Sequence, residues 1–171
     1  MRHPTPAAAK RLPRWGVLAA ALALAVTDLA LKVLAEATLT ARSEPQFLGP
    51  LELRLTYNPG VAFSLGASLP AWTIVALTGL ITATVAAYAW YSAPTTPLLG
   101  RVGVAGVLGG ALSNLIDRSL DGVVTDYLHT GWWPTFNLAD TLIIGGAVLL
   151  VLTSARQSSP AVSDNDRDAR T

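Results

Sequence analysis

The stretch GGALSNLIDR, residues 109–118, decides the fold, because a glycine-rich apolar run there ends in an amide, an acid and a base. A second acid, Asp126, follows after a short apolar step. A third, Asp140, stands near the start of another apolar run, FNLADTLIIGGAVLLVL, at 136–152. Charged residues are only 13% of the chain, so acids at the edges of two hydrophobic segments require an explanation.

The composition indicates an integral membrane protein with a single small domain. Of the 171 residues, 51% are hydrophobic and the mean hydropathy is +0.45, whereas a soluble domain carries about a quarter charged residues. The net charge of +1, with no basic patch outside the N-terminal tail, gives no reason to expect a nucleic-acid partner. The chain has no cysteine and only two histidines, so we expect no disulfide, no thiol nucleophile and no metal cofactor.

Four apolar runs are long enough to cross a membrane as helices, which takes about 20 residues each. They lie at about 15–34, 71–91, 99–116 and 136–152. We therefore expect a four-helix membrane domain over 15–153, between polar, disordered tails at 1–14 and 154–171.

The first run has an alternative interpretation as a cleaved signal peptide, because the AEA at 35–37 has the small-x-small form of a cleavage site. We favour a retained span, since the run is long for a signal peptide and Asp28 and Lys32 interrupt its end. These two side chains are four positions apart, so on a helix they share a face and can pair.

The polar segments between the runs carry local signals of their own. The LELRLTY at 51–57 alternates strictly between apolar and polar residues, which predicts a half-buried strand. The turn-forming NPG at 58–60 ends that strand, and residues 61–65 form a short apolar piece that we expect at the membrane surface. A second polar loop is predicted at 117–135.

The basic residues orient these spans. The N-terminal tail carries four of them, and Arg101 flanks the short loop between the second and third spans. The positive-inside rule therefore places both termini in the cytoplasm. With that orientation, nearly every polar side chain in or beside the membrane is expected near the outer face. The set is Asp28, Lys32, Asn58, Asn114, Asp117, Arg118, Asp126, Asn137 and Asp140.

Ionisable groups at membrane depth are costly and predict function. The first-span and third-span acids each have a base beside them, so we expect those two pairs to be structural. Asp126 and Asp140 have only Arg118 and His129 nearby in sequence. Two carboxylates forced together share a proton, because like-charge repulsion and desolvation raise one pKa. One can then accept a proton from water while the other donates to a carbonyl, which is aspartic-protease chemistry.

A small membrane transporter or proton-conducting protein is the alternative from another class, since it also keeps acids inside a bundle. A conduction path places polar groups through the full depth of the membrane. Here they are expected in one half only. A metalloprotease is disfavoured by the scarcity of histidine and the absence of cysteine.

Five blocks of the sequence resemble the lipoprotein signal peptidase family, also called signal peptidase II, in the family's order and over roughly residues 15–153. They are Asp28…Lys32, Asn58-x-Gly60-x-Ala62-Phe63, Gly109-Gly110-Ala111-x-x-Asn114-Leu115-Ile116-Asp117-Arg118, Val124-x-Asp126-Tyr127 and Phe136-Asn137-x-Ala139-Asp140. The resemblance implies an all-α integral membrane fold of four transmembrane helices, with a small extracytoplasmic β-sheet and a short surface helix after Gly60.

The resemblance also implies an activity, an aspartic endopeptidase of the bacterial cytoplasmic membrane. The family removes signal peptides from diacylglyceryl-modified prolipoproteins, cuts before the lipidated cysteine, and is the target of the cyclic peptide antibiotic globomycin. Its catalytic dyad falls on Asp126 and Asp140, near the outer face among the membrane lipids. Its supporting and substrate-binding positions fall on Asp28, Lys32, Asn58, Gly60, Asn114, Asp117, Arg118 and Asn137.

The residue types suggest roles for these positions. We expect Asn114 and Asn137 to hold the two carboxylates by hydrogen bonds, and Asn58 to contact the substrate backbone. Arg118 is expected to pin a loop, a carboxylate or a substrate carbonyl, and Asp117 beside it to be structural.

Two positions depart from the family pattern. Leu29 stands where the family commonly has Gln, and Ser113 stands where it commonly has Gly. Both departures bear on local packing and substrate contacts, and neither changes the two acids.

Overall fold

The computed structural model describes residues 12–39, 46–60 and 70–158. The surface helix expected after Gly60, and most of both expected tails, lie outside the described residues. The described chain forms four helices and three strands, in the order α1 (Leu12–Leu39), β1 (Gln46–Leu48), β2 (Leu51–Asn58), α2 (Ala71–Ser92), α3 (Leu98–Asp121), β3 (Val124–His129) and α4 (Leu138–Ser158).

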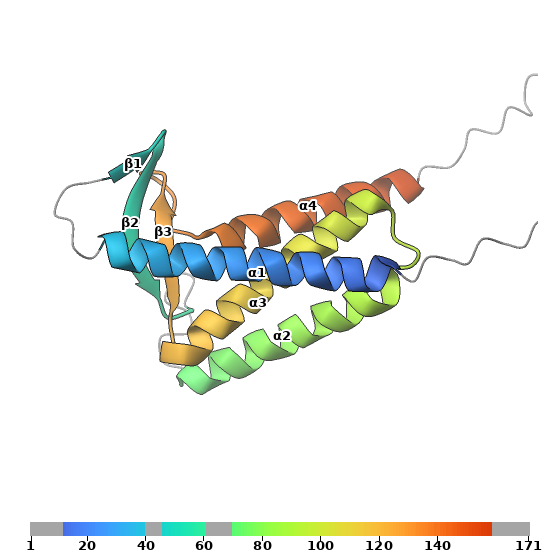
Figure 1. Ribbon diagram of the computed structural model, residues 1–171, viewed down its shortest axis with the longest axis horizontal. Helices are drawn as coiled ribbons and strands as arrows, with labels where there is room; N and C mark the ends of the chain where they lie inside the picture. The colour runs from blue at the N-terminus through green and yellow to red at the C-terminus, as the bar shows by residue number, and fades with distance from the viewer. Residues whose placement is uncertain (1–11, 40–45, 61–69, 159–171) are drawn as a thin grey trace, which may run out of the picture.

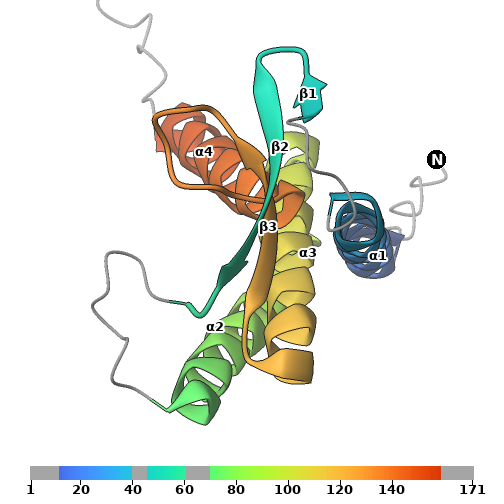
Figure 2. The ribbon, with the colours of Figure 1, turned by 90° about the vertical axis from the view of Figure 1, so that its left-hand side faces the viewer.

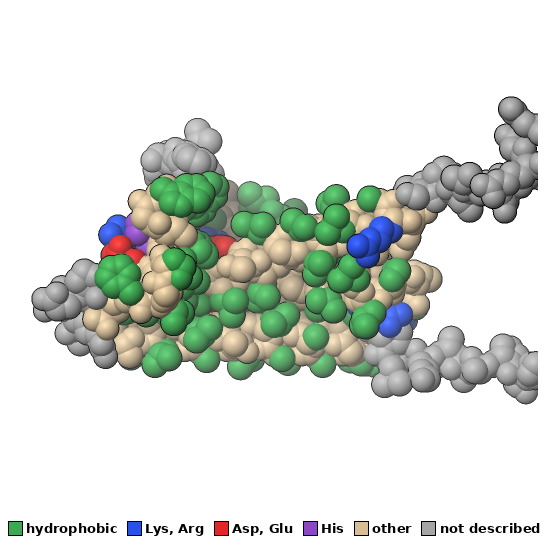
Figure 3. Space-filling model, turned by 90° about the horizontal axis from the view of Figure 1, so that it is seen from above, with side chains coloured by type: hydrophobic (Ala, Val, Ile, Leu, Met, Phe, Trp, Pro, Cys, Tyr) green, Lys and Arg blue, Asp and Glu red, His purple; other side chains and the backbone are tan. Residues whose placement is uncertain are grey.

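All four helices are long and apolar enough to cross a membrane. Hydrophobic side chains follow the length of the helical body in Figure 3, whereas the acidic side chains visible on that face lie near one end. The predicted fold class, four spanning helices with a small sheet, is confirmed.

α3 is the central helix, and α1, α2 and α4 each pack against it (Figure 2). Two adjacent glycines of α3 explain how the backbones of α1 and α4 approach it closely. A Cβ on Gly109 would lie 2.7 Å from the Ala21 carbonyl oxygen of α1, and a Cβ on Gly110 would meet the Ala139 carbonyl oxygen of α4. Consecutive helical residues point about 100° apart. The glycine pair therefore admits two neighbouring helices on two faces, as small residues do in membrane bundles.

The helix ends differ from the predicted ones. α3 continues to Asp121, so Asp117 and Arg118 are helical instead of lying in the predicted loop. Gly122 follows as a left-handed C-cap: it has φ 88° and donates its N–H to the Arg118 carbonyl at 2.9 Å. α4 begins at Leu138, and it continues to Ser158, so residues 154–158 of the expected tail are helical.

The three strands form one antiparallel sheet in the order β1-β2-β3. The predicted strand at 51–57 is confirmed as β2, and β1 is its hairpin partner. β3 corrects the prediction of a loop over 117–135. Its first four residues are all buried, so it lacks the alternation that reveals a half-buried strand. The sheet lies at the end of the bundle where α1 and α3 end and α4 begins (Figure 1).

Candidate active site

The site is built around the first turn of α4. The Asn137 side-chain oxygen accepts the Asp140 backbone N–H at 2.9 Å, and the Asp140 carboxylate accepts the Asn137 backbone N–H at 3.3 Å. This reciprocal pair is a capping box. The three-residue spacing of Asn137 and Asp140 is therefore explained by the helix start itself, which orients the Asp140 side chain.

Two other elements cap the remaining free N–H groups of that turn. The Leu138 N–H donates to the Tyr127 hydroxyl oxygen of β3 at 3.2 Å, and the Ala139 N–H donates to Asp28 Oδ1 of α1 at 3.0 Å. Uncapped N–H groups at a helix start are costly when buried. The start of α4, and Asp140 with it, is therefore positioned jointly by α1, β3 and its own cap.

Three asparagines hold the two acids. Asn137 Nδ2 donates to Asp126 Oδ1 at 2.7 Å, and Asn58 Nδ2 donates to Asp126 Oδ2 at 3.2 Å. Asn114 Nδ2 donates to Asp140 Oδ1 at 3.0 Å. Asn137 thus contacts one acid through its side-chain amide and the other through its backbone, so both carboxylates meet at one residue. Asn58, expected to contact substrate, is bonded to Asp126 here.

Asp126 lies on β3, outside the spanning helices, and its side chain is buried. Burial and the neighbouring Asp140 carboxylate raise the pKa of Asp126 to about 7, against the opposing effects of Asn58, Asn137 and Lys32. A carboxyl group with this pKa holds a proton for much of the time near neutral pH.

Lys32 forms ion pairs with two acids next to the site. Its Nζ lies 3.1 Å from Asp28 Oδ2 and 3.0 Å from Asp117 Oδ2, and it donates to Asn114 Oδ1 at 2.7 Å. The predicted Asp28–Lys32 pair is present. The predicted Asp117–Arg118 pair is wrong, because Asp117 is bound to Lys32. Adjacent residues on a helix point in different directions, so Asp117 faces α1 while Arg118 does not.

Arg118 lies beside α2. Its Nη1 donates to Thr78 Oγ1 at 3.4 Å, and its Nε is buried without a hydrogen-bond partner among the described residues. Gly60 has φ 87°, and a Cβ there would lie 3.2 Å from Arg118 Nε. Glycine is needed at this position by both conformation and space.

Four residues outside the predicted site residues complete the network: Glu36, Ser113, Thr125 and Tyr127. Thr125 makes three hydrogen bonds. Its N–H donates to Asp117 Oδ2 at 2.8 Å, its hydroxyl donates to Glu36 Oε1 at 2.8 Å, and its carbonyl accepts from Asn137 Nδ2 at 3.4 Å. Thr125 directly precedes Asp126, so these bonds fix the strand that carries the acid. Glu36 and Thr125 are 89 positions apart, and no local pattern links them.

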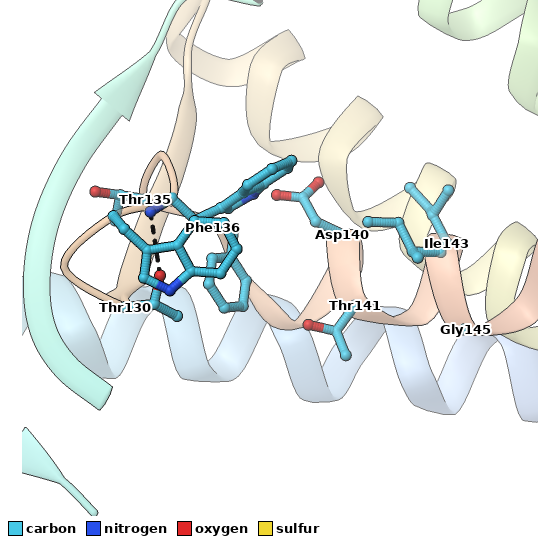
Figure 4. A pocket seen from close by; sticks show the side chains of 10 residues that line it. Thr130, Thr135, Phe136, Asp140, Thr141, Ile143 and Gly145 are labelled. Carbon is cyan, nitrogen blue, oxygen red and sulfur yellow. Dashed lines mark hydrogen bonds between the residues drawn. The ribbon is translucent and has the colours of Figure 1, made fainter. Parts of the chain in front are cut away.

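A cavity of about 620 Å³ opens beside Asp140. Figure 4 shows the Asp140 side chain directed toward the loop that carries Thr130, Thr135 and Phe136. The walls of the cavity are mainly apolar. They are formed by Thr130, Trp132, Trp133, Thr135, Phe136, Asp140, Thr141, Ile143, Ile144 and Gly145. Within the described ranges, no group of three or more His, Asp or Glu side chains is arranged to hold a metal ion. The cavity therefore offers one carboxylate to a largely apolar occupant.

The fold and this site define a class of protein: a multi-pass membrane protein with two carboxylates, each hydrogen-bonded to Asn137, at one end of its helical bundle. The family model of signal peptidase II matches residues 20–156. The chain belongs to the signal peptidase II family, and it is a protease that cleaves signal peptides from prolipoproteins.

Several curated relatives carry the name lipoprotein signal peptidase. One from Sinorhizobium fredii is 38% identical, with 78% of this chain and 82% of the relative covered. One from Brucella ovis is 37% identical, with 84% and 91% covered. One from Mycobacterium avium is 35% identical, with 81% and 78% covered.

Two solved bacterial membrane enzymes share the fold. The first has a TM-score of 0.72 at 23% identity, covering 85% of this chain and 90% of that chain. The second has a TM-score of 0.69 at 21% identity, covering 85% and 95%.

Proposed function

We propose that the protein is an aspartic endopeptidase that removes the signal peptide from diacylglyceryl-modified prolipoproteins by cutting before the lipidated cysteine, with Asp126 and Asp140 as its catalytic dyad. The observation that carries this proposal is the contact of both carboxylates with Asn137. Two acids that contact the same residue at the edge of an apolar bundle are expected to share one proton, as a peptide-hydrolysing dyad requires.

The charges around the dyad support a shared proton. Asp28, Asp117, Asp126 and Asp140 lie close together in the network, and Lys32 is the single cation that makes an ion pair with any of these four within the described part of the chain. An uncompensated buried charge is expensive. Retaining one proton on the dyad lowers the net negative charge.

The reaction then follows from ordinary acid–base chemistry. The ionised carboxylate takes a proton from water as the water oxygen attacks the scissile carbonyl carbon, and the protonated carboxyl donates to the carbonyl oxygen. When the resulting tetrahedral intermediate collapses, the C–N bond breaks and a dyad proton passes to the leaving cysteine amine. The signal peptide leaves with a new carboxyl group.

The surrounding residues have supporting roles in this mechanism. Asn58, Asn114 and Asn137 orient the carboxylates. Asp28, Lys32 and Asp117 hold the elements that carry them. Arg118 has a buried N–H without a described partner, and we assign it to a substrate carbonyl, next to the close approach of Gly60.

The orientation of the protein rests on its basic residues. Arg14, Arg101 and Arg156 belong to the start of α1, the start of α3 and the end of α4, which share the end of the bundle opposite the sheet (Figure 1). The positive-inside rule places that end, and both termini, in the bacterial cytoplasm. The dyad then lies near the outer face of the cytoplasmic membrane, level with the lipid headgroups where a lipid-modified cysteine resides. Globomycin-type inhibitors are expected to bind at the same site.

The proposal is tested by cleavage of a diacylglyceryl-modified prolipoprotein with the purified full chain in detergent, with a chelator present. We expect the folded Asp126→Asn and Asp140→Asn variants each to lose about 10²–10⁴-fold in kcat, the range for general acid–base groups. Asp121→Asn is the matched control, because Asp121 is exposed at the end of α3.

Near-full activity in either dyad variant would show that the acid concerned is structural. A folded wild-type protein that never cuts this substrate would contradict the proposed substrate and cut site.

A further inference from the structure

Ser113 and Asp28 form a fully buried contact behind the site. Neither residue is exposed to solvent, and the Ser113 hydroxyl donates to Asp28 Oδ2 at 2.6 Å. Charge-assisted hydrogen bonds of this length are about twice as strong as neutral ones. Because Ser113 lies on α3 and Asp28 on α1, the bond fixes the carboxylate relative to the central helix.

The two oxygens of Asp28 have different partners. Oδ2 accepts from Ser113 and lies 3.1 Å from Lys32 Nζ. Oδ1 accepts the Ala139 N–H at 3.0 Å and lies 3.5 Å from the Tyr127 hydroxyl. The planar carboxylate thus transmits its orientation from Ser113 on one side to the first turn of α4 on the other.

Asp28 Oδ2 therefore faces two donors, Ser113 and Lys32, whose side chains differ in length. Lys32 has a long, flexible stem and also binds Asp117 and Asn114, so it does not fix one orientation of the carboxylate by itself. The Ser113 hydroxyl is on a short side chain of the most buried helix. It selects the rotation of Asp28 that presents Oδ1 to Ala139, the residue immediately before Asp140.

We propose that Ser113 is a positioning residue for the reaction: it orients Asp28 so that Asp28 caps α4 and keeps Asp140 in place for catalysis. The inference rests on the proposed dyad. Ser113 itself touches neither acid of the dyad in any hydrogen bond of the described chain, so its effect on the reaction passes through Asp28 and the Ala139 N–H.

The test compares Ser113→Ala with Ser119→Ala in the cleavage assay described above. Ser119 lies on the same helix, but its exposed hydroxyl donates to the Leu115 carbonyl of its own helix. We expect Ser113→Ala to lower kcat about ten-fold and to leave KM within about two-fold of the wild type. This loss is smaller than the roughly hundred-fold cost of misplacing a catalytic group by 1 Å. Ser119→Ala should match the wild type. Ser113→Cys keeps a weak donor of similar size and should fall between Ser113→Ala and the wild type.

Amide hydrogen exchange distinguishes a local effect on α4 from a general loss of stability, because a general loss would speed exchange throughout the protein. In Ser113→Ala the peptide covering residues 136–142 should exchange faster, because the Ala139 amide loses its oriented acceptor, while the first turn of α3 is unchanged. In an Asp28→Asn background, adding Ser113→Ala should have little further effect on kcat, since coupled residues are non-additive.

A folded Ser113→Ala protein with wild-type kcat, a loss confined to KM, or unchanged exchange at the start of α4 would each overturn the inference. If Ser113→Ala does not fold, the same criteria apply to Ser113→Cys. Asp140→Asn is measured in parallel, so the two proposals fail separately. Activity in Asp140→Asn contradicts the dyad, whereas an inactive Asp140→Asn with an unaffected Ser113 variant contradicts only the positioning role.

Discussion

The two ends of the helical bundle are held together by different interactions. At the polar end, where the sheet meets the start of α4, hydrogen bonds around Lys32 and Asn137 join α1, α3, α4 and β3. At the opposite end, beside the α2–α3 connection, the interior is packed by apolar groups, so we call it the apolar end: Trp15 meets Trp90 edge-on with ring centroids 5.4 Å apart, and small side chains such as Ala89 fill the core.

The difference follows from what each end must do. Apolar contacts are non-directional, so they hold helices together without specifying the orientation of any one group. Hydrogen bonds weaken steeply when misaligned. A site that must hold two carboxylates in a defined geometry needs directional bonds, whereas the far end of the bundle needs only close packing.

Removing the Lys32 charge should have the largest effect, on stability. In Lys32→Met, Asp28 and Asp117 lose a cation within 3.1 Å, and an acid left buried without its partner costs about 3–5 kcal/mol. Thermal unfolding in detergent measures the loss. Arg54→Met is the control, because it breaks a half-exposed bridge to Glu52 that is expected to contribute under about 1 kcal/mol. Equal losses in the two variants would contradict the importance of the buried charges.

Glycine substitutions should separate packing from catalysis. A Cβ on Gly103 would lie 2.7 Å from the Gly146 carbonyl oxygen at the apolar end, and one on Gly110 would meet the Ala139 carbonyl beside the site. Overpacking of this kind costs about 1–3 kcal/mol, so both alanine variants should unfold more easily. Only Gly110→Ala should also lower kcat. Gly16→Ala is the control and should not be destabilised, because there is open space around the new methyl group. A kcat loss in Gly103→Ala equal to that in Gly110→Ala would contradict the expected difference between the two ends of the bundle.

The pH dependence of cleavage should report the proton shared at the polar end. The pKa of Asp126 is raised to about 7 by burial and Asp140, so the proton that the dyad needs is present below that pH and lost above it. Activity should fall about ten-fold per pH unit on the alkaline side, as expected for loss of a single proton. Asn58 donates to Asp126 and favours its ionised form, so Asn58→Ala should move the alkaline limb upward. Constant activity between pH 6 and 9 would exclude this proton as essential.

The smallest effect is expected at Thr125. Thr125→Val removes the hydroxyl bonded to Glu36 but keeps the shape and both backbone bonds of the residue. Because one of three contacts is lost, kcat should fall by about two- to five-fold, matching a net hydrogen bond of about 0.5–1 kcal/mol. Thr125→Ser retains the hydroxyl and should stay near the wild type. Identical activity in the Val and Ser variants would show that the Glu36 contact does not position Asp126.

Some of the site could be predicted because its determinants are local. The Asp28–Lys32 pair follows from a four-residue helical spacing, and the family blocks point to Asp126, Asp140 and the asparagines that hold them. β3 could not be predicted from its pattern, since a strand covered on both faces lacks alternation. The hydroxyl of Ser113 could be noted as a departure from the family, but its partner, 85 positions away, could not be named.

By itself the sequence determined how many helices could cross the membrane, where the alternating strand lies, and that the scarce acids stand at the ends of apolar segments. These features depend on hydropathy and on spacings of one or two turns. Only the tertiary structure decided that Asp117 binds Lys32 instead of Arg118, and that Asp28 caps α4. Those partners depend on how each helix is rotated against α3, which is set by backbone approach at Gly109 and Gly110, and a linear spacing carries no information about that rotation.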